Sequence, residues 1–299
     1  MHRALAQLYG HPYLLLTLTM LMWGGNAVAS RLAVGEVSPM TLTFLRWTLP
    51  VALLGVALHQ QLLAHRQALA ERWPLVLLMG TLGLTVFNAL MYVAAHHTTA
   101  VNITILQGSM PVFVLVGTLV FYGTRIQGRQ MIGMAVTLLG ALLVATRADV
   151  ATLTSFSFNI GDLWMLAACG LYAGYTVALR TRPPVPGLVF FAALAGVALL
   201  TSVPLMAYEV ASGTVTWPTL RGWLIVLYVG LFPSFVSQVL FMRGVELIGP
   251  GRAGLFVNLV PIFGALLAVL ILDEPFAAYH AVGLALVLGG IWLAEPKER

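Results

Sequence analysis

Amide, hydroxyl and aromatic side chains recur at helical spacing inside otherwise apolar segments of this sequence. Trp23, Asn26 and Ser30 lie at i, i+3 and i+7, so a helix places them on one face. Polar side chains within apolar spans are costly and usually face the interior of a helix bundle. Five further segments carry such stripes, and we expect all six to surround one central cavity. The candidate binding residues are Trp23, Asn26, Asn88, Tyr92, Gln107, Trp164, Tyr172, Tyr175, Gln238 and Asn258.

The predicted cavity is uncharged, rich in amides and aromatic. Amides and hydroxyls hydrogen-bond an ammonium or a carboxylate without supplying net charge. Aromatic faces stack on flat rings and attract cations by roughly 0.5–2 kcal/mol. We therefore expect a zwitterion with an apolar or aromatic side chain, or a planar cation, as the ligand. A phosphorylated sugar fits badly because no Arg and Lys cluster lines these faces. The pattern calls for no cofactor and no metal.

Each of these residues also has a purely structural interpretation. An amide in a span can bond a neighbouring helix. We prefer cavity lining for Asn88 and Gln238, because an internal repeat aligns the two amides. Trp164 is either a substrate contact or a tryptophan of the membrane interface. Arg46, within an apolar segment, is either a charge that snorkels toward the outer surface, which we prefer, or a carboxylate anchor.

Composition identifies the solvent of this chain as lipid. It has 299 residues, of which 60% are hydrophobic and 8% charged, whereas soluble domains carry about 25% charged residues. So few charges cannot cover a globular surface. The basic residues are scattered between apolar segments, which excludes a nucleic-acid patch.

Ten apolar segments are long enough, or nearly so, to cross a hydrocarbon core about 30 Å thick. The longest connections between them are His59 to Trp73 and Arg147 to Asn159. The predicted fold is therefore an all-α membrane protein with ten transmembrane helices. The segments are 13–33, 40–60, 74–95, 101–122, 129–146, 160–180, 187–207, 222–242, 253–272 and 279–294.

The sequence is an internal duplication. A shift of 150 residues places Pro111 on Pro261 and the glycine pair 133 and 140 on 283 and 290. We divide the chain into a first five-helix repeat (1–147), a linker (148–159) and a second five-helix repeat (160–299). An odd number of spans per copy makes the two repeats inverted, an arrangement typical of transporters rather than enzymes. The prolines predict matched kinks that flex or make room for the cavity.

Arginine placement predicts the orientation. With a cytoplasmic N-terminus, eleven of the 15 Lys and Arg residues fall on the cytoplasmic side and three outside. Both termini are then cytoplasmic. The paired glycines of segments 129–146 and 279–294 predict a small-residue packing seam. These two helices pack either on each other or on a second subunit, so a homodimer through them is one of the partners we consider, beside the lipid bilayer.

Carboxylates are missing from the interior of the spans. All ten acidic residues lie in loops or near segment ends, whereas proton-coupled carriers usually keep a carboxylate within a span. We therefore favour a facilitator. An intramembrane enzyme is the rival class, but the adjacent His96 and His97 point about 100° apart on a helix and make a poor metal clamp.

The ten spans, the five-plus-five duplication and the proline-centred segments at Leu106–Phe113 and Val257–Phe263 resemble the EamA branch of the drug/metabolite transporter superfamily. Asp273-Glu274-Pro275 resembles its acidic turn, whereas the first half departs from it with Gly123-Thr124-Arg125. The resemblance is strongest to YddG-type aromatic amino-acid exporters of the bacterial inner membrane. It implies a multi-pass transporter, not an enzyme, that exports aromatic and other neutral amino acids, or planar cationic drugs, by alternating access. The alternatives are a proton-coupled multidrug or other metabolite transporter and, last, an intramembrane enzyme.

Overall fold

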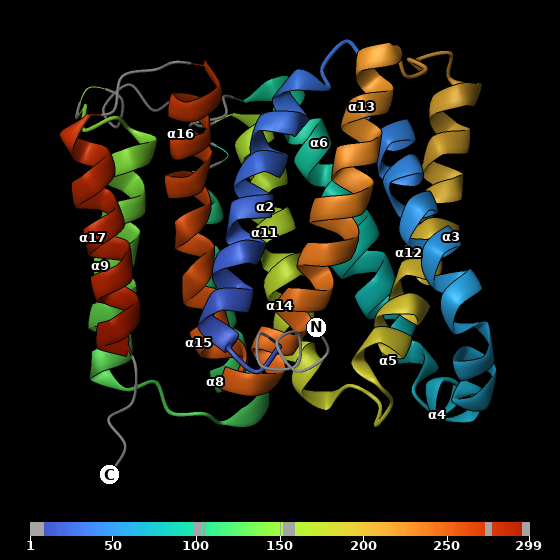
Figure 1. The fold of residues 1–299 in the computed structure, drawn as a ribbon, viewed down its shortest axis with the longest axis horizontal. Coiled ribbons are helices and arrows are strands. Elements are labelled where there is room, and N and C mark those ends of the chain that lie inside the picture. Colours follow the sequence, from blue (N-terminus) through green and yellow to red (C-terminus); the bar gives the residue numbers. More distant parts are fainter. Residues whose placement is uncertain are drawn as a thin grey trace.

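The computed structural model describes residues 9–98, 103, 106–149, 151, 159–272 and 277–294, and within these ranges the regular elements are all helical (Figure 1). Eight helices are long and apolar enough to cross a membrane, and two shorter apolar helices accompany them. Each of the ten predicted segments overlaps one of these helices. The eight are Pro12–Leu32, Pro39–Ala64, Trp73–His97, Gly128–Ala145, Ile160–Thr181, Gly187–Ala211, Leu220–Ile248 and Pro250–Leu267, and the shorter two are Met110–Tyr122 and Ala278–Ala294.

The first half of the chain runs from α2 to α9, and one expected connection in it proves to be helical. Residues 59–73 lie mostly in helix, because α3 continues to Ala64 and a short helix follows. The elements are α2 (Pro12–Leu32), α3 (Pro39–Ala64), α4 (Arg66–Glu71), α5 (Trp73–Leu78), η1 (Met79–Val86), α6 (Phe87–His97), α8 (Met110–Tyr122) and α9 (Gly128–Ala145).

The second half runs from α11 to α17. The predicted acidic turn 273–275 and most of the predicted linker lie outside the described residues. The elements are α11 (Ile160–Ala178), η2 (Leu179–Thr181), α12 (Gly187–Ala211), α13 (Leu220–Val229), η3 (Gly230–Val236), α14 (Ser237–Ile248), α15 (Pro250–Leu255), η4 (Phe256–Asn258), α16 (Leu259–Leu272) and α17 (Ala278–Ala294).

Two prolines mark matched interruptions of the helices rather than smooth kinks. Pro111 lies in the first turn of α8, directly after a turn at Gly108 and Ser109. Pro261 lies in the first turn of α16, directly after the 3₁₀ turn η4. Pro111, the second residue of α8, loses no helical hydrogen bond, because the first N–H groups of a helix have no partner within it.

A π-helical stretch occurs at the same place in each half. The segments η1 and η3 match under the 150-residue shift, and each ends two residues before a predicted cavity amide, Asn88 or Gln238. Pro233 lies inside η3 and removes one backbone donor. A π-helical turn changes the direction in which the following side chains point, and such turns are frequent at functional sites.

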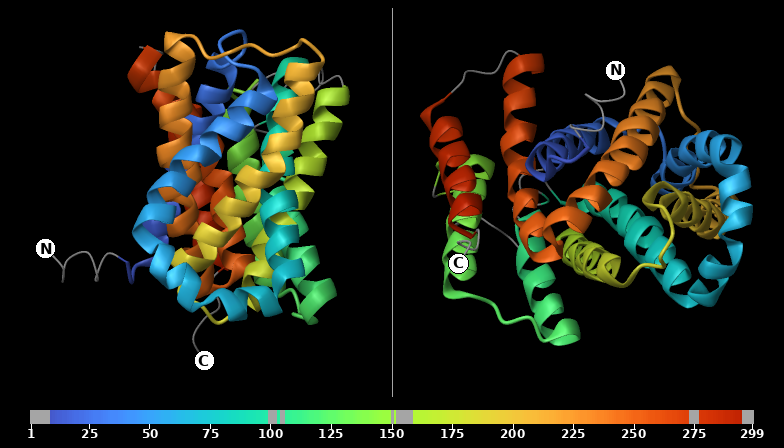
Figure 2. Two further views of the ribbon diagram at one scale, coloured as in Figure 1. Left: turned by 90° about the vertical axis from the view of Figure 1, so that its right-hand side faces the viewer. Right: turned by 60° about the horizontal axis from the view of Figure 1, so that its bottom comes forward.

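Helices α9 and α17 pack on each other along the predicted glycine seam. A Cβ atom on Gly133 would lie 2.5 Å from the carbonyl oxygen of Gly290, and one on Gly140 would lie 2.7 Å from that of Gly283. The pairing makes the two helices antiparallel and forbids any larger residue at the contact. Figures 1 and 2 show this pair side by side at one edge of the bundle. The two glycine faces thus pack on each other within one chain.

Successive long helices cross the bundle in alternate directions (Figure 1). The first turn of α2 and the last turn of α17 therefore lie at the same end, and α2 and α11 run in opposite directions. Buried aromatic and aliphatic residues fill the centre, with Trp47, Tyr172, Phe190 and Phe241 among the largest fully buried side chains. The outer faces of the bundle remain apolar, as a lipid solvent requires.

Candidate substrate-binding site

A cavity of about 30 Å³ lies among α2, α3, α6, α11 and α14. It is much smaller than typical ligand pockets of about 300–1,000 Å³, so a ligand of that size would fit only if the helices moved apart. The structure brings six of the ten predicted binding residues to this cavity. The residues that line it are Trp23, Asn26, Arg46, Phe87, Asn88, Met91, Gln107, Met110, Tyr172, Pro233, Gln238, Val257 and Val260.

Arg46 lines the cavity, so the expectation of an uncharged cavity is wrong. Its side chain is 3% exposed and does not snorkel outward. The Nε atom donates to Ser234 Oγ at 2.7 Å, while Nη1 donates to Tyr92 OH at 2.6 Å and to Asn88 Oδ1. These three acceptors are buried, so the guanidinium keeps its hydrogen bonds inside the bundle.

The buried Arg46 guanidinium has no acidic partner among the described residues. It contacts neutral oxygens and two aromatic rings, those of Trp47 and Tyr92, whose centroids lie 5.6 Å from Cζ. No hydrogen bond from Nη2 occurs within the described part of the chain. An isolated charge in a low-dielectric interior is expensive until a counter-charge pairs with it. The cavity therefore favours a ligand with an anionic group.

Two buried acceptors in the same cavity also lack partners. Asn26 Oδ1 and Gln107 Oε1 have no hydrogen bond, and each side chain is 7% exposed. Leaving a buried acceptor unsatisfied costs about 1–3 kcal/mol. A ligand ammonium offers three N–H donors to such oxygens. The cavity thus presents a cation and free acceptors together, which is complementary to a zwitterion.

Gln238 joins the polar lining to an aromatic wall. Its Oε1 accepts hydrogen bonds from Tyr172 OH at 3.2 Å and from Tyr175 OH at 3.5 Å. No bond of Nε2 occurs among the residues that the structure describes, so this amide donor is available to a ligand. Asn88, the matching amide of the first half, instead donates to Leu84 O and accepts from Arg46. The two amides therefore occupy matching positions in the two halves of the chain but make different hydrogen bonds.

Four rings form the aromatic wall. The centroid of the Tyr172 ring lies 4.8 Å from that of Phe87, 5.8 Å from that of Phe241 and 5.3 Å from that of Trp23. The planes of the Tyr172 and Trp23 rings meet at 88°, which is an edge-on contact. Trp23 is fixed further by its Nε1, which donates to Ser237 Oγ at 2.9 Å. Such a wall supplies flat apolar faces for a ligand side chain.

Four predicted residues do not line the cavity. Tyr92 and Tyr175 lie one layer behind it, where they bond Arg46 and Gln238. Asn258 is fully buried but donates from Nδ2 to Thr137 Oγ1 at 2.8 Å, because the 3₁₀ turn η4 directs it to α9. Trp164 is 39% exposed in the first turns of α11, where neighbouring helices do not cover it.

The described acidic residues lie away from the cavity. Glu209 and Asp162 are buried, but each is at a helix end and receives backbone or hydroxyl donors there. Glu36 and Glu246 form ion pairs with arginines near the ends of the bundle. No described carboxylate lines the cavity.

Comparisons with known proteins place the fold and the family. The model of the EamA-like transporter family matches twice, at residues 11–146 and 159–294. A solved crystal structure superposes with a TM-score of 0.76 at 22% identity and covers 95% of this chain and 96% of its own. At that identity the likeness shows a shared fold.

Relatives of similar length carry transporter names. The "Uncharacterized transporter YetK" of Bacillus subtilis is 25% identical over 96% of this chain and 87% of its own. The "Probable terminal-alkyne amino-acid exporter" of Streptantibioticus cattleyicolor is 26% identical over 94% of this chain and 92% of its own. The "Probable amino-acid metabolite efflux pump" of Escherichia coli is 23% identical, with 92% of both chains covered.

The family and its relatives are named as transporters, not as enzymes. The resemblance to the EamA branch is thereby confirmed. With its apolar helices and two family matches that together span most of its length, this chain belongs to the EamA-like transporter family and is a multi-pass membrane protein.

Proposed function

We propose that this protein exports aromatic and other neutral amino acids across the bacterial inner membrane by alternating access. The observation that carries the proposal is the coincidence, in one buried cavity, of a guanidinium without a counter-charge and two acceptors without donors. Two relatives whose names refer to amino-acid export support the same substrate class.

We propose a place in the cavity for each part of an amino acid. The α-carboxylate pairs with Arg46, which can donate from Nη2 while its other nitrogens stay bonded to the protein. The α-ammonium fits the free oxygens of Asn26 and Gln107. The side chain packs on Trp23, Phe87 and Tyr172. A planar cationic drug is the weaker candidate, because Arg46 repels a cation that has no carboxylate.

The proposed architecture is ten spans in two inverted five-helix repeats, residues 1–147 and 160–299, with both termini in the cytoplasm. The matched π segments η1 and η3 and the matched interruptions before α8 and α16 support it, as does the opposite direction of α2 and α11. A small closed cavity between the repeats supports alternating access. A homodimer stays a prediction, and it would use the exposed outer faces of α9 and α17, such as Leu139 and Trp292.

The proposal makes the protein a facilitator, because no described carboxylate lines the cavity to relay a proton. Purified protein in liposomes should exchange radiolabelled phenylalanine with saturable kinetics, with or without a pH gradient. Methionine and threonine should compete. Phenylethylamine, which lacks the carboxylate, should compete poorly, and so should phenylpropionate, which lacks the ammonium. Effective competition by phenylethylamine but not by phenylpropionate would contradict the role of Arg46 as the substrate anchor. Flux that requires the gradient would contradict the facilitator.

A further inference from the structure

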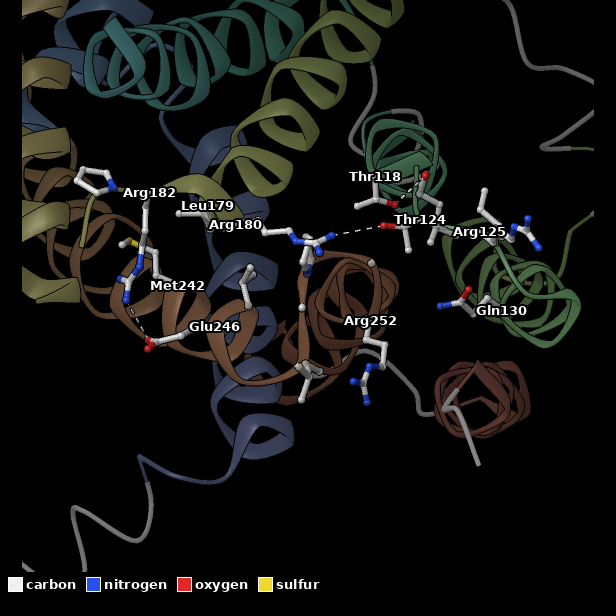
Figure 3. Close-up of a pocket in the computed structure, with 18 of the residues that line it drawn as sticks. Thr118, Thr124, Arg125, Gln130, Leu179, Arg180, Arg182, Met242, Glu246 and Arg252 are labelled. Carbon is white, nitrogen blue, oxygen red and sulfur yellow. Dashed lines mark hydrogen bonds and ion pairs between the residues drawn. The ribbon is translucent and has the colours of Figure 1, made fainter. Parts of the chain in front are cut away.

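A second pocket opens at the end of the bundle where α8, α11 and α14 finish. Its volume is about 630 Å³, within the range of ligand pockets. Figure 3 shows Thr124, Arg125 and Gln130 on one side of it, Arg182 and Glu246 on the other, and Arg180 and Arg252 between them. The distribution of arginines in the sequence predicts that this end is cytoplasmic.

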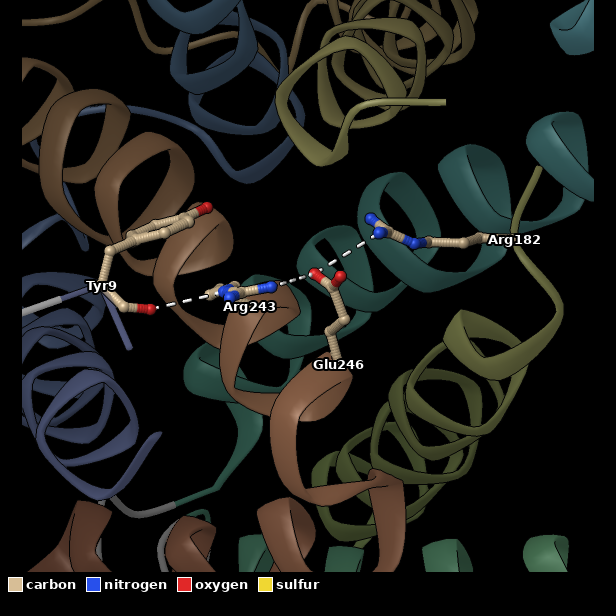
Figure 4. A network of polar contacts seen from close by, with 4 residues as sticks. All are labelled: Tyr9, Arg182, Arg243 and Glu246. Carbon is tan, nitrogen blue, oxygen red and sulfur yellow. Dashed lines mark hydrogen bonds and ion pairs between the residues drawn. The ribbon is translucent and has the colours of Figure 1, made fainter. Parts of the chain in front are cut away.

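The pocket carries a large excess of positive charge. Four arginines line it, Arg125, Arg180, Arg182 and Arg252, against one carboxylate, Glu246. Glu246 is already engaged, since its Oε2 lies 3.4 Å from Arg182 Nη2 and 3.1 Å from Arg243 Nη1 (Figure 4). The other three arginines form no ion pair within the described part of the chain.

Arg180 is held in position toward the pocket. Its Cζ lies 4.6 Å from the centroid of the Tyr122 ring, and its Nη1 donates to Thr124 Oγ1 at 3.4 Å. Arg252 lies in α15 and is only partly exposed. The arginines thus come from separate elements that converge on one space, in which Arg125 and Arg180 are exposed.

The walls between the arginines are apolar. Leu115, Leu179, Val185 and Met242 line the same pocket, and Leu179 and Val185 are buried. A ligand that satisfies both surfaces has an anionic group beside an apolar part. The proposed cargo fits poorly, because a neutral amino acid has no net charge for an arginine cluster to attract.

We propose that this pocket binds the phosphate of an acidic phospholipid, with the glycerol and first acyl carbons on the apolar wall. Planar guanidinium groups bind phosphate in bidentate fashion, and basic pockets between helices on the cytoplasmic side bind acidic headgroups. The pocket lies at the helix ends, where a bilayer presents its headgroups. The group that the arginines would recognise is a phosphate, which soluble phosphate compounds also carry.

Bound lipid would act on the transport pathway through α14. Gln238 lines the central cavity, while Met242 and Val245 line the basic pocket one and two turns further along the same helix. A phosphate that bridges Arg252 of α15 with Arg180 of η2, directly after α11, would connect the ends of these two helices.

The test is native mass spectrometry of the full chain in detergent with phosphatidylglycerol or with phosphatidylcholine of identical acyl chains. We expect a saturable adduct with phosphatidylglycerol alone. The double variant Arg125→Gln/Arg252→Gln should weaken that adduct at least tenfold. The matched control is Arg66→Gln/Arg72→Gln, which removes the same charge around α4 at the same end of the bundle but outside the pocket.

Three results would overturn the proposal. Equal loss in the control would assign the binding to general positive charge. Retention of inorganic phosphate or glycerol phosphate with no phosphatidylglycerol adduct would assign the pocket to a soluble anion. An unchanged adduct in the pocket variant would place the lipid elsewhere. If the double variant fails to fold, each single variant should still weaken the adduct several-fold. The readout needs no transport, so it stands apart from the proposed cargo.

Discussion

The Nε atom of Arg46 donates a 2.7 Å hydrogen bond to Ser234 Oγ, and this bond joins the two halves of the chain. Ser234 lies in η3, and its hydroxyl donates at 2.7 Å to Val229 O, five residues earlier. Its lone pairs therefore face Arg46. The bond couples the orientation of the buried cation to a π-helical segment of the other repeat, so a movement of η3 would redirect the guanidinium.

We expect Arg46→Met to abolish substrate binding without unfolding the protein. Removing one member of a desolvated charge pair costs about 2–5 kcal/mol of binding, which is about 30-fold to several thousand-fold in Kd. Without substrate, however, Arg46 is a buried cation with no counter-charge, so relief of that cost offsets the hydrogen bonds that Ser234, Asn88 and Tyr92 lose. Tryptophan-fluorescence titration with phenylalanine and thermal unfolding measure the two effects. Lost binding together with a strongly lowered Tm would identify a structural arginine instead.

Gln107→Leu should weaken recognition of the α-ammonium and leave recognition of the carboxylate intact. The variant removes an acceptor that has no partner in the unloaded protein, so stability should change little. We expect about 1–3 kcal/mol less affinity for phenylalanine and unchanged affinity for phenylpropionate, which has no ammonium. Competition assays with the two compounds give the ratio. Asn26→Leu is the companion variant, and equal losses for both compounds would contradict the assignment.

The sequence predicts the positions of the helices well, because a lipid environment leaves the backbone few choices. An apolar segment in a bilayer must satisfy its hydrogen bonds internally, so hydropathy alone places the helices close to their observed bounds. The helical extension after α3 was missed because residues 59–73 are polar enough to read as a connection. The π segments were missed because η1 carries no distinctive residue, although Pro233 is a signal in η3.

The site was harder to predict, because helical spacing fixes a face only while a helix stays regular. Asn258 follows the cavity spacing, but the 3₁₀ turn η4 alters the direction of its side chain. The sequence alone does not reveal that Arg46 faces the cavity, because its partners Asn88 and Ser234 lie 42 and 188 residues away in the sequence. The sequence does contain a signal for this position, since an arginine within an apolar span almost always faces the interior of the bundle.

Gly290→Ala should destabilise the protein, while the neighbouring Gly289→Ala should not. A Cβ atom on Gly290 would lie 2.6 Å from the backbone oxygen of Gly133, whereas one on Gly289 meets nothing within 4 Å. Overpacking of a tight contact costs about 1–3 kcal/mol. Unfolding of both variants in the same detergent gives the comparison, and equal stabilities would show that α9 and α17 do not touch through this face.

Glu209→Gln should destabilise the contact between α12 and α3. The Glu209 carboxylate accepts hydrogen bonds from Thr41 N at 2.9 Å, Thr41 Oγ1 at 2.8 Å, Ser38 Oγ at 2.5 Å and Met40 N at 3.1 Å. It thus caps α3 from another helix, where the positive end of the helix dipole favours an anion. An amide cannot accept with both of its heavy atoms, so we expect a loss of about 2–3 kcal/mol.

The control for Glu209→Gln is Glu71→Gln, because Glu71 is exposed and its side chain receives one hydrogen bond, from Gln67 Nε2 at 3.2 Å. Exposed substitutions of this kind stay within about 0.5 kcal/mol. Since Glu209 lies far along the bundle from the cavity and does not line it, transport per folded molecule should be unchanged in both variants. Loss of transport by Glu209→Gln at full stability would instead make this carboxylate part of the transport cycle.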